Sequence, residues 1–215
     1  MNEICDLLHK RLNKLPRYSF PFAKSDIFEN GIYIMFEKGE KAHSVDRIVR
    51  IGSHTGKDNL FSRLNDHFYK ENKDRSILRK NIGRCILNKE KNPYLKVWDI
   101  DFTTKKSKEM NGNLINEELQ KEIEDKVTKY LRENFSFVII EVPDKDQRMY
   151  FESKLISTVS NCPICKPSET WLGNFSTKTK IRESGLYLVN KLYKESFNKK
   201  GIEKFLNTYV KNKNI

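Results

Sequence analysis

The sequence predicts a mixed α/β domain, and three observations lead to this fold class. Three short apolar runs, at residues 31–37, 47–52 and 135–142, have the composition of β-strands. The first two are separated by a polar segment that contains Gly39, which is typical of a β-hairpin. Around the strands, apolar residues recur at helical spacing. A chain of 215 residues without an internal repeat or a clear linker is predicted to form one domain over residues 1–215.

The N-terminal segment is predicted to be a short amphipathic helix over residues 2–14, because its apolar residues recur at helical spacing. Pro16 and Pro21 end this helix and favour an extended segment. The aromatic side chains of that segment are expected to pack under the sheet; they are Tyr18, Phe20 and Phe22.

The first predicted strand, residues 31–37, is apolar on both faces and is therefore expected to be covered. Tyr33 would then lie near the core, with its hydroxyl directed at a polar neighbour. Residues 38–46 are polar and are predicted to form the hairpin loop. The second strand, residues 47–52, carries Arg50 inside an apolar run, which is costly unless the charge is paired.

A turn at residues 52–56, which includes His54, precedes a helix that the pattern predicts over residues 58–70. At about 100° per residue, Arg63 and His67 lie together beside the apolar stripe of this helix. Their position suits the wall of a cleft, and it equally suits an ordinary solvated helix edge.

The remaining apolar patterns predict further helices, at residues 75–87, 116–133, 145–160 and 201–211. The run at 135–142 is the strongest strand pattern in the chain. Residues 184–190 are predicted to be an edge strand or a packed segment. Residues 88–115 lack a regular pattern and are predicted to be an insertion or a substrate-facing loop.

The predicted helix over residues 145–160 places a carboxylate where an apolar side chain is expected. By the same 100° geometry, Glu152 lies within the apolar stripe of this helix. Carboxylates are almost never buried without a partner. Glu152 is therefore predicted to meet a cation, a metal ion or a hydrogen-bonding cluster, and a buried ion pair is the simplest of these outcomes.

The chain carries a formal charge of +12, which indicates an anionic partner, most often nucleic acid. Abundant Lys and Asn throughout the chain offer a second explanation, a bias in composition without a binding role. No apolar run reaches the roughly 18 residues that a membrane span needs. The N-terminus lacks the pattern of a signal peptide, so the chain is expected to be cytoplasmic, with no membrane partner.

Four cysteines are too few and too scattered for a disulfide framework, which favours a reducing compartment. Cys162 and Cys165 form one CxxC motif, whereas a structural zinc site usually needs four ligands. Cys85 and His54 are available to complete such a site, but nothing in the spacing requires it. A plain turn closed by Pro163 is the favoured interpretation.

The exceptional polar residues are of the types that phosphodiester hydrolysis requires. A base must take a proton from water. A metal ion held by carboxylate oxygen must polarise the phosphate, and a cation such as Arg must meet the charge on the phosphoryl oxygens. These types are supplied by Tyr33, Arg50, Arg63, His67 and Glu152.

The order of these residues resembles the GIY-YIG nuclease superfamily. Gly31-Ile32-Tyr33, followed by Arg50-Ile51-Gly52, is similar to the paired signature of that superfamily. The resemblance extends over residues 20–190, with N-terminal and C-terminal additions. It implies an α+β fold in which a small antiparallel three-stranded sheet is flanked by helices, in agreement with the three strands predicted above.

The resemblance also implies roles for individual residues. Tyr33 would activate the attacking water, and Arg63 would bind and stabilise the scissile phosphate. His67, whose pairing with Arg63 is closest to the restriction-endonuclease-like branch, would assist proton transfer or hold the phosphate. Glu152 would bind a single divalent metal ion, Mg²⁺ or Mn²⁺, and Asn174 would support the metal or phosphate site.

The sequence departs from the signature at one position, because Arg50 stands where the second triplet has Tyr. A free phenol has a pKa of about 10, so it is a poor base at neutral pH. A neighbouring cation favours the phenolate form. Arg50 or His54 is placed to supply that cation beside Tyr33, and Arg50 is otherwise placed to hold a phosphate.

The function that the resemblance implies is a metal-dependent endonuclease that hydrolyses phosphodiester bonds of double-stranded DNA, with sequence-specific restriction as its most specialised form. One such site cuts one strand, so a double-strand break needs a homodimer or two visits by a monomer. The alternative is a catalytically inactive nucleic-acid-binding protein of the same fold, favoured by the missing second Tyr. A third hypothesis is a protein that is not a nuclease, either an interaction module or a zinc protein built on Cys162 and Cys165.

Overall fold

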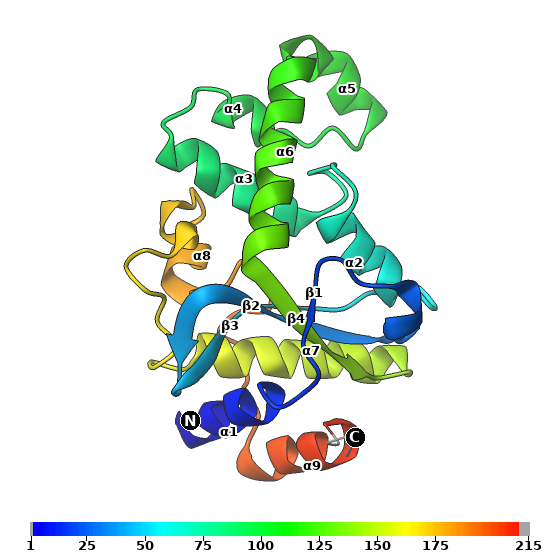
Figure 1. The fold of residues 1–215 in the computed structure, drawn as a ribbon, viewed down its shortest axis with the longest axis vertical. Coiled ribbons are helices and arrows are strands. Elements are labelled where there is room, and N and C mark those ends of the chain that lie inside the picture. The colour runs from blue at the N-terminus through cyan, green and yellow to red at the C-terminus, as the bar shows by residue number, and fades with distance from the viewer. Residues whose placement is uncertain (1, 211–215) are drawn as a thin grey trace.

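The computed structural model of the chain describes residues 2–210. A four-stranded antiparallel sheet lies at its centre, in the strand order β1-β4-β2-β3 (Figure 1). Its strands are β1 (Tyr18–Ser19), β2 (Gly31–Ala42), β3 (Val45–Gly52) and β4 (Phe135–Glu141). The predicted α+β class is confirmed, and each of the three predicted strands is present.

The short strand β1 corrects the expectation of a three-stranded sheet. It pairs with β4 through two residues, Tyr18 opposite Phe137 and Ser19 opposite Ser136. The Tyr18 ring stacks on Phe137 with 5.6 Å between ring centroids, and Phe22 packs edge-on against the same ring. The predicted packing on the sheet is therefore confirmed for Tyr18 and Phe22, whereas Phe20 packs against Tyr69 and Arg132. Two residues are too few to show the alternating pattern by which a strand is found in a sequence.

Helices cover both faces of the sheet (Figure 1). The upper helices in that view are α2 (Leu60–Phe68), α3 (Ile77–Lys89) and α6 (Glu117–Asn134). The lower helices are α1 (Asn2–Leu12), α7 (Lys145–Ser160) and α9 (Lys199–Tyr209). Alternation along β2 separates two cores, because Tyr33 and Met35 face the upper helices whereas Ile32 and Ile34 face the lower ones.

The hairpin is longer than predicted, and the expected loop at residues 38–46 is wrong. Strand β2 continues to Ala42, and β3 begins at Val45. The turn consists of His43 and Ser44, whose φ angles of 54° and 63° are those of a tight two-residue hairpin turn. This extension was not predicted because several residues that follow Glu37 are polar. One of them, Glu40, is nevertheless buried, and it forms an ion pair with Arg47 of β3.

Two later segments also differ in detail from the prediction. Residues 88–115, predicted to be irregular, contain α4 (Leu95–Trp98), α5 (Lys105–Asn111) and η2 (Gly112–Leu114). Residues 184–190 form the packed segment rather than the edge strand, and the Tyr187 N–H donates to the Val49 carbonyl of β3 at 2.9 Å. The remaining short helices are η1 (Lys24–Asp26), η3 (Leu172–Phe175) and α8 (Thr179–Ser184).

The length and apolar character of the helices bear on whether the chain could cross a membrane. Within residues 2–210, none of the helices combines the length and the apolar character that a membrane crossing requires.

Candidate active site

Tyr33 lies in the middle of the sheet, paired with Gly52 of β3 and with Ile139 of β4. Its ring covers Gly52 so closely that a Cβ atom at that position would collide with the Tyr33 Oη and Cζ atoms. Any side chain at residue 52 would therefore displace the phenol. The hydroxyl is held at the end of β3, where the chain leaves the sheet, and the Tyr33 side chain is buried as predicted.

The polar partner of Tyr33 is His67 on α2. The distance between Tyr33 Oη and His67 Nε2 is 2.8 Å, and His67 Nδ1 lies 2.6 Å from Ser76 Oγ. Ser76 is the N-cap of α3, and its Oγ also accepts the backbone N–H of Arg79 at 3.2 Å. A hydroxyl, an imidazole and a phenol thus form one continuous hydrogen-bonded chain from a helix start to the sheet.

His67 is completely buried in an environment that disfavours its charged form. Burial holds the pKa of His67 well below its ordinary value of 6.5, and the positive charges of Arg50, Arg63 and Arg79 lower it further. His67 is therefore neutral at physiological pH, with one ring nitrogen able to accept a proton. Arg63 acts on His67 through its charge, but the predicted edge position holds for Arg63 alone, because His67 lies inside the core.

Arg50 lies on the same face of the sheet as Tyr33, and it contributes to the electrostatic environment of His67. Its Nη1 atom donates to the Tyr187 carbonyl at 2.6 Å, and the side chain is buried. Its Nε atom is also buried and has no hydrogen-bond partner within residues 2–210. The sequence predicted that this charge needs a partner, and in the structure that partner is the Tyr187 main-chain carbonyl.

Arg63 is the more accessible cation, with 26% of its side chain exposed. It contacts the Arg75 carbonyl at 3.1 Å and Asp66 at 3.4 Å, and it lines a groove of about 1080 Å³. The positive charge of Arg63 also acts on His54, whose pKa is lowered mainly by burial. Arg63 thus stands between the groove and the turn that follows β3.

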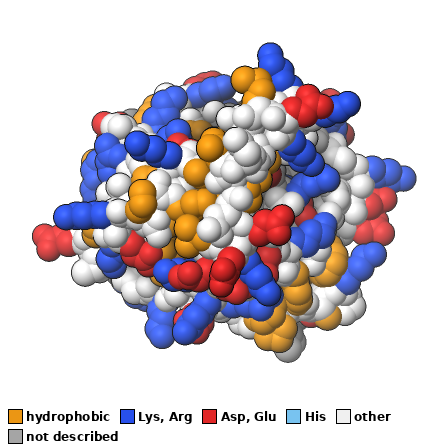
Figure 2. Space-filling model, turned by 90° about the horizontal axis from the view of Figure 1, so that it is seen from above, with side chains coloured by type: hydrophobic (Ala, Val, Ile, Leu, Met, Phe, Trp, Pro, Cys, Tyr) orange, Lys and Arg blue, Asp and Glu red, His pale blue; other side chains and the backbone are white. Residues whose placement is uncertain are grey.

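The groove beside Arg63 is lined by residues of α2, the α2–α3 loop and the segment before α6. They are Asn59, Ser62, Arg63, Asp66, Lys70, Asn72, Asp74, Arg75, Phe102, Thr103 and Lys108. Four of these carry positive charge and two carry negative charge. Seen from above, Lys and Arg side chains surround this end of the molecule, with acidic side chains among them (Figure 2).

His54 is fixed by main-chain groups. Its Nδ1 atom lies 2.8 Å from the Gly56 carbonyl, and its Nε2 accepts the Gly31 N–H at 3.3 Å. These contacts use both ring nitrogens and tie the turn after β3 to the start of β2. In addition, the His54 carbonyl accepts a hydrogen bond from Arg148 of α7 at 3.4 Å.

Glu152 reaches the end of β3 from α7. Its Oε2 accepts the Ser53 hydroxyl at 2.6 Å and lies 2.9 Å from Lys191 Nζ. Since Ser53 follows Gly52, on which the Tyr33 ring lies, the carboxylate and the phenol approach the same strand end. Of the three outcomes predicted for this carboxylate, the described residues supply an ion pair together with a hydroxyl hydrogen bond.

The donor set fits a magnesium ion held by a single carboxylate. The Glu152 side chain is 12% exposed, and both of its hydrogen bonds within residues 2–210 involve Oε2. Oε1 is thus available as an oxygen ligand, and Mg²⁺ commonly binds one or two carboxylates while keeping several waters. The ammonium of Lys191 lies where it would compete with that cation.

Asn174, which was predicted to support the metal or phosphate site, has its side-chain contacts elsewhere. Its side-chain amide donates to the carbonyls of Ser168 and Glu169 at 2.9 Å and 3.0 Å, closing the loop before η3. Among the described residues, Asn174 makes no hydrogen bond to Glu152 or Tyr33.

Four further residues that contact the site were not identified from the sequence. Ser76 and Ser53 are small hydroxyl residues whose partners lie far along the chain. Lys191 is one of many lysines, and Arg148 is a buried Arg that donates to the Val142 and Pro143 carbonyls. The N-cap position of Ser76 just before an apolar run was the one detectable feature.

The structure defines an α+β protein in which helices cover both faces of an antiparallel sheet, with a buried phenol in that sheet. The sequence model of one family, described as GIY-YIG domain, matches residues 3–215. The chain therefore belongs to the GIY-YIG domain family, and the predicted family is confirmed. No curated protein and no solved structure matches this chain.

Proposed function

We propose that the protein is a metal-dependent DNA endonuclease in which Tyr33 activates the attacking water. The observation that carries this proposal is the hydrogen-bonded chain from Ser76 through His67 to Tyr33, which ends beside the strand terminus that Glu152 contacts. Simple phosphate binding requires cations, whereas it does not require a buried phenol bonded to a neutral imidazole.

The proton route follows from the charge state of His67. With a proton on Nδ1, His67 donates to Ser76 Oγ, and its Nε2 accepts the Tyr33 hydroxyl. Tyr33 can then pass its proton toward His67 as it takes one from water. In this arrangement His67 is the group that receives the Tyr33 proton, and burial together with the charge of Arg50 keeps its imidazole neutral beforehand.

The phosphate would be held by Arg63, whose guanidinium is half-buried at the groove and suits phosphoryl oxygens. Glu152 would hold Mg²⁺ or Mn²⁺, with Ser53 orienting its carboxylate. The bound cation would polarise the scissile phosphate and lower the pKa of a coordinated water. The cation would displace the Lys191 ammonium from Glu152, so the negative charge of the carboxylate would stay balanced.

Double-stranded DNA is the proposed substrate, and sequence-specific restriction is the proposed specialised form. The predicted substrate-facing segment, residues 88–115, contributes Phe102, Thr103 and Lys108 to the groove beside Arg63. This placement supports a role of that segment in contacting nucleic acid. The proposed catalytic core spans residues 20–190, and a homodimer or successive visits would cut both strands.

Plasmid cleavage with Mg²⁺ or Mn²⁺ tests the proposal. Tyr33→Phe is expected to lower the cleavage rate by about 100-fold or more, since acid–base groups contribute that much, and to retain DNA binding. Glu152→Gln is expected to do the same through loss of the cation. Tyr69→Phe is the matched control, because Tyr69 is a half-buried tyrosine that bonds the Phe22 main chain outside the site. Undiminished cleavage by both site variants would overturn the proposal.

The second candidate function is nucleic-acid binding without catalysis. It is favoured by the ion pair between Glu152 and Lys191 and by the almost complete burial of Tyr33. The two candidates differ in one result: a binding protein retains its DNA but leaves the plasmid intact with either metal ion.

A further inference from the structure

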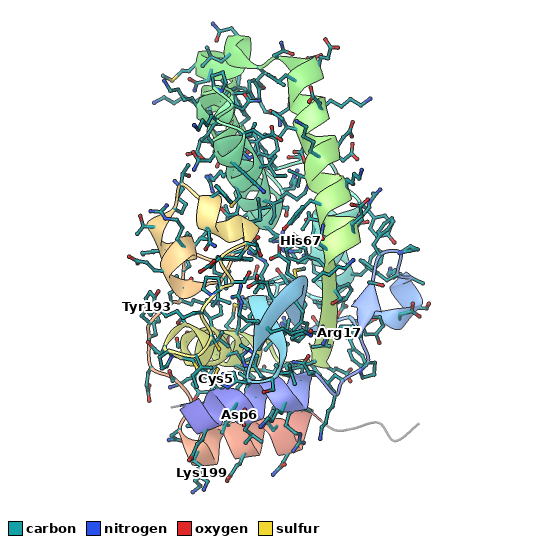
Figure 3. The ribbon with its side chains drawn as sticks, turned by 60° about the vertical axis from the view of Figure 1, so that its left-hand side comes forward. Cys5, Asp6, Arg17, His67, Tyr193 and Lys199 are labelled. Atoms are coloured by element: carbon teal, nitrogen blue, oxygen red, sulfur yellow. The ribbon has the colours of Figure 1, made fainter. Side chains whose placement is uncertain are left out.

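A cluster of sulfur and imidazole groups lies on the opposite side of the sheet from Tyr33 and His67. Figure 3 shows Cys5 on α1, below the sheet, and His67 above it. We name this group the sulfur–imidazole cluster; its members are Cys5, His9, His43, Cys162 and Cys165. They come from three distant segments: α1, the hairpin turn and the loop after α7. This inference concerns a site separate from the proposed nuclease centre.

The separations within the cluster are those of ligands around one small ion. Cys165 Sγ lies 3.4 Å from both Cys5 Sγ and His43 Nε2, and Cys162 Sγ lies 3.5 Å from His43 Nε2. For zinc–sulfur bonds of about 2.3 Å and zinc–nitrogen bonds of about 2.0 Å, the edges of a tetrahedron are about 3.5 to 3.8 Å. The cluster is therefore close to the required size.

His43 is oriented as a metal-binding imidazole. Its Nδ1 atom lies 3.6 Å from the Asp6 carboxylate, and its side chain is 3% exposed. A carboxylate at one ring nitrogen fixes the tautomer and leaves the lone pair of the other nitrogen for a metal ion. That other nitrogen, Nε2, is the atom that faces Cys162 and Cys165.

His9 lies beside the same sulfur atoms, but its two ring nitrogens have main-chain partners. Nδ1 lies 3.0 Å from the Cys5 carbonyl, and Nε2 accepts the Ile48 N–H at 3.3 Å. These contacts make His9 a support that joins α1 to β3. Cys162, whose sulfur lies 3.5 Å from His43 Nε2, is then the better fourth ligand.

We propose that Cys5, His43, Cys162 and Cys165 bind one Zn²⁺ ion in a closed tetrahedral site. Three sulfur ligands and one imidazole select zinc among the common divalent ions. On binding, the three thiols release their protons to solvent, and each sulfur donates a lone pair to the metal. All three cysteines are buried, which suits a structural ion without an open position.

The zinc ion would fasten three parts of the chain that are far apart in the sequence. It joins α1 to the tip of the β2–β3 hairpin and to the end of α7, the helix that carries Glu152. The candidates that the sequence offered for completing a zinc site lie elsewhere. Cys85 is part of the upper core, and His54 is bound to Gly56 and Gly31.

Metal analysis of the full chain, purified under reducing conditions and passed through metal-free buffer, tests the site directly. We expect close to one zinc per chain by mass spectrometry of the metals. After replacement by Co²⁺, we expect the intense visible absorption of a tetrahedral cobalt–thiolate site. A zinc chelator is expected to lower the melting temperature, since zinc binding is coupled to folding.

Variants identify the ligands. Cys162→Ser and His43→Gln are expected to weaken zinc binding at least about tenfold. His9→Gln is expected to retain zinc. Cys85→Ser is the matched control, because it removes a buried thiol outside the cluster. Glu152→Gln is also expected to retain zinc, which separates this site from the proposed magnesium site.

The proposal is overturned if the reduced wild-type chain neither contains zinc nor binds added Zn²⁺ or Co²⁺. A chain mass two hydrogens below that of the free thiols would instead assign the cluster to a disulfide and also overturn it. Retention of zinc by Cys162→Ser with loss by His9→Gln would reject the ligand set. None of these readouts depends on cleavage of nucleic acid.

Discussion

The Tyr33 hydroxyl and the His67 imidazole meet because two different elements hold them. Tyr33 is fixed by the ring contact on Gly52, whereas His67 is fixed by Ser76 at the start of α3. The sequence indicated both residues through a phenol in an apolar strand and a helix-edge histidine. It did not indicate that they touch, since that contact joins residues 34 positions apart.

At the scale of this pair, His67→Gln is expected to flatten the acid side of the stability profile. The pKa of His67 is lowered in the folded chain, so the unfolded chain alone takes up this proton as pH falls below about 6.5. The folded state then loses up to about 1.4 kcal/mol per pH unit until its own lower pKa is reached.

Chemical denaturation between about pH 5 and pH 7 measures this difference. The wild-type free energy of unfolding should fall toward the acid end, and that of the variant should fall less. His9 and His54 titrate in both proteins, so the difference between the two slopes isolates His67. Equal slopes would contradict a buried neutral imidazole.

A second change at residue scale concerns the ion pair at the proposed magnesium ligand. Lys191→Met removes the ammonium 2.9 Å from Glu152 Oε2, so a cation no longer competes for the carboxylate. We expect the variant to bind Mg²⁺ or Mn²⁺ at a several-fold lower concentration than the wild type, which corresponds to a gain of about 1 kcal/mol in binding free energy. Isothermal titration measures binding without cleavage. Lys194→Met removes a lysine from the same segment and should leave the affinity unchanged.

Within helix α3, Ser76 has two roles: it is the N-cap of the helix and the hydrogen-bond partner of His67. Ser76→Ala is expected to cost about 1 kcal/mol of stability through the lost cap and also to lower cleavage. Thr104→Ala removes a comparable cap from α5, where the Thr104 side chain accepts the Ser107 N–H. Equal loss of activity in the two variants would show that capping alone explains the effect.

Helices α3 and α6 are joined by a buried ion pair. Arg79 Nη2 lies 2.6 Å from Glu124 Oε2, and both side chains are almost completely buried. Arg79→Met leaves the Glu124 carboxylate unpaired, so a loss of about 3 to 5 kcal/mol is expected in urea denaturation. Lys126→Met, which breaks exposed pairs on α6, is expected to change stability by less than about 1 kcal/mol. Similar losses in the two variants would contradict this difference.

Helices and strands with a regular apolar pattern were predictable from the sequence, and α7 begins and ends where the pattern predicted. The hairpin was predictable as well, but its full length was not, because its outer half is stabilised by charged groups. Glu37 is buried there and accepts the Trp171 indole N–H at 2.7 Å, a contact between residues 134 positions apart. Burial raises the pKa of Glu37. Such partners cannot be found from local periodicity.

At the scale of the whole molecule, positive charge is available at the groove and elsewhere on the surface. Lys70→Ala, Arg75→Ala and Lys108→Ala each remove a cation that lines the groove. If these groups contact phosphates, each change should lower the slope of log affinity against log salt by about one unit. Fluorescence anisotropy with duplex DNA over a range of salt measures this slope.

Lys199→Ala is the matched control for the groove variants. Lys199 lies at the start of α9, at the opposite end of the molecule from α5 (Figures 1 and 3). Its removal lowers the net charge equally, and the salt slope should stay unchanged. Equal effects of all four changes would mean that DNA senses the net charge rather than the groove.

The candidate site combines features that differ in how well a sequence can reveal them. Glu152 was visible because it breaks an apolar pattern, whereas Tyr33, Arg63 and His67 were identified through the order of residues that resembles the family. The covering of both faces of β2 was visible, since both faces are apolar. The CxxC motif was interpreted as a plain turn because its neighbours, on α1 and at the hairpin tip, lie more than a hundred residues away in the sequence.

The outer edge of β3 is partly closed to the addition of a further strand. The Val49 carbonyl on that edge already accepts the Tyr187 N–H, and at the other edge β1 offers only two residues for pairing. On that side β1 lies opposite Phe137 and Ser136 alone, and Ile139, Ile140 and Glu141 of β4 line a pocket beside Tyr18 instead of pairing with a strand there. Addition of a strand from a second copy is therefore restricted along β3, the edge strand next to Tyr33.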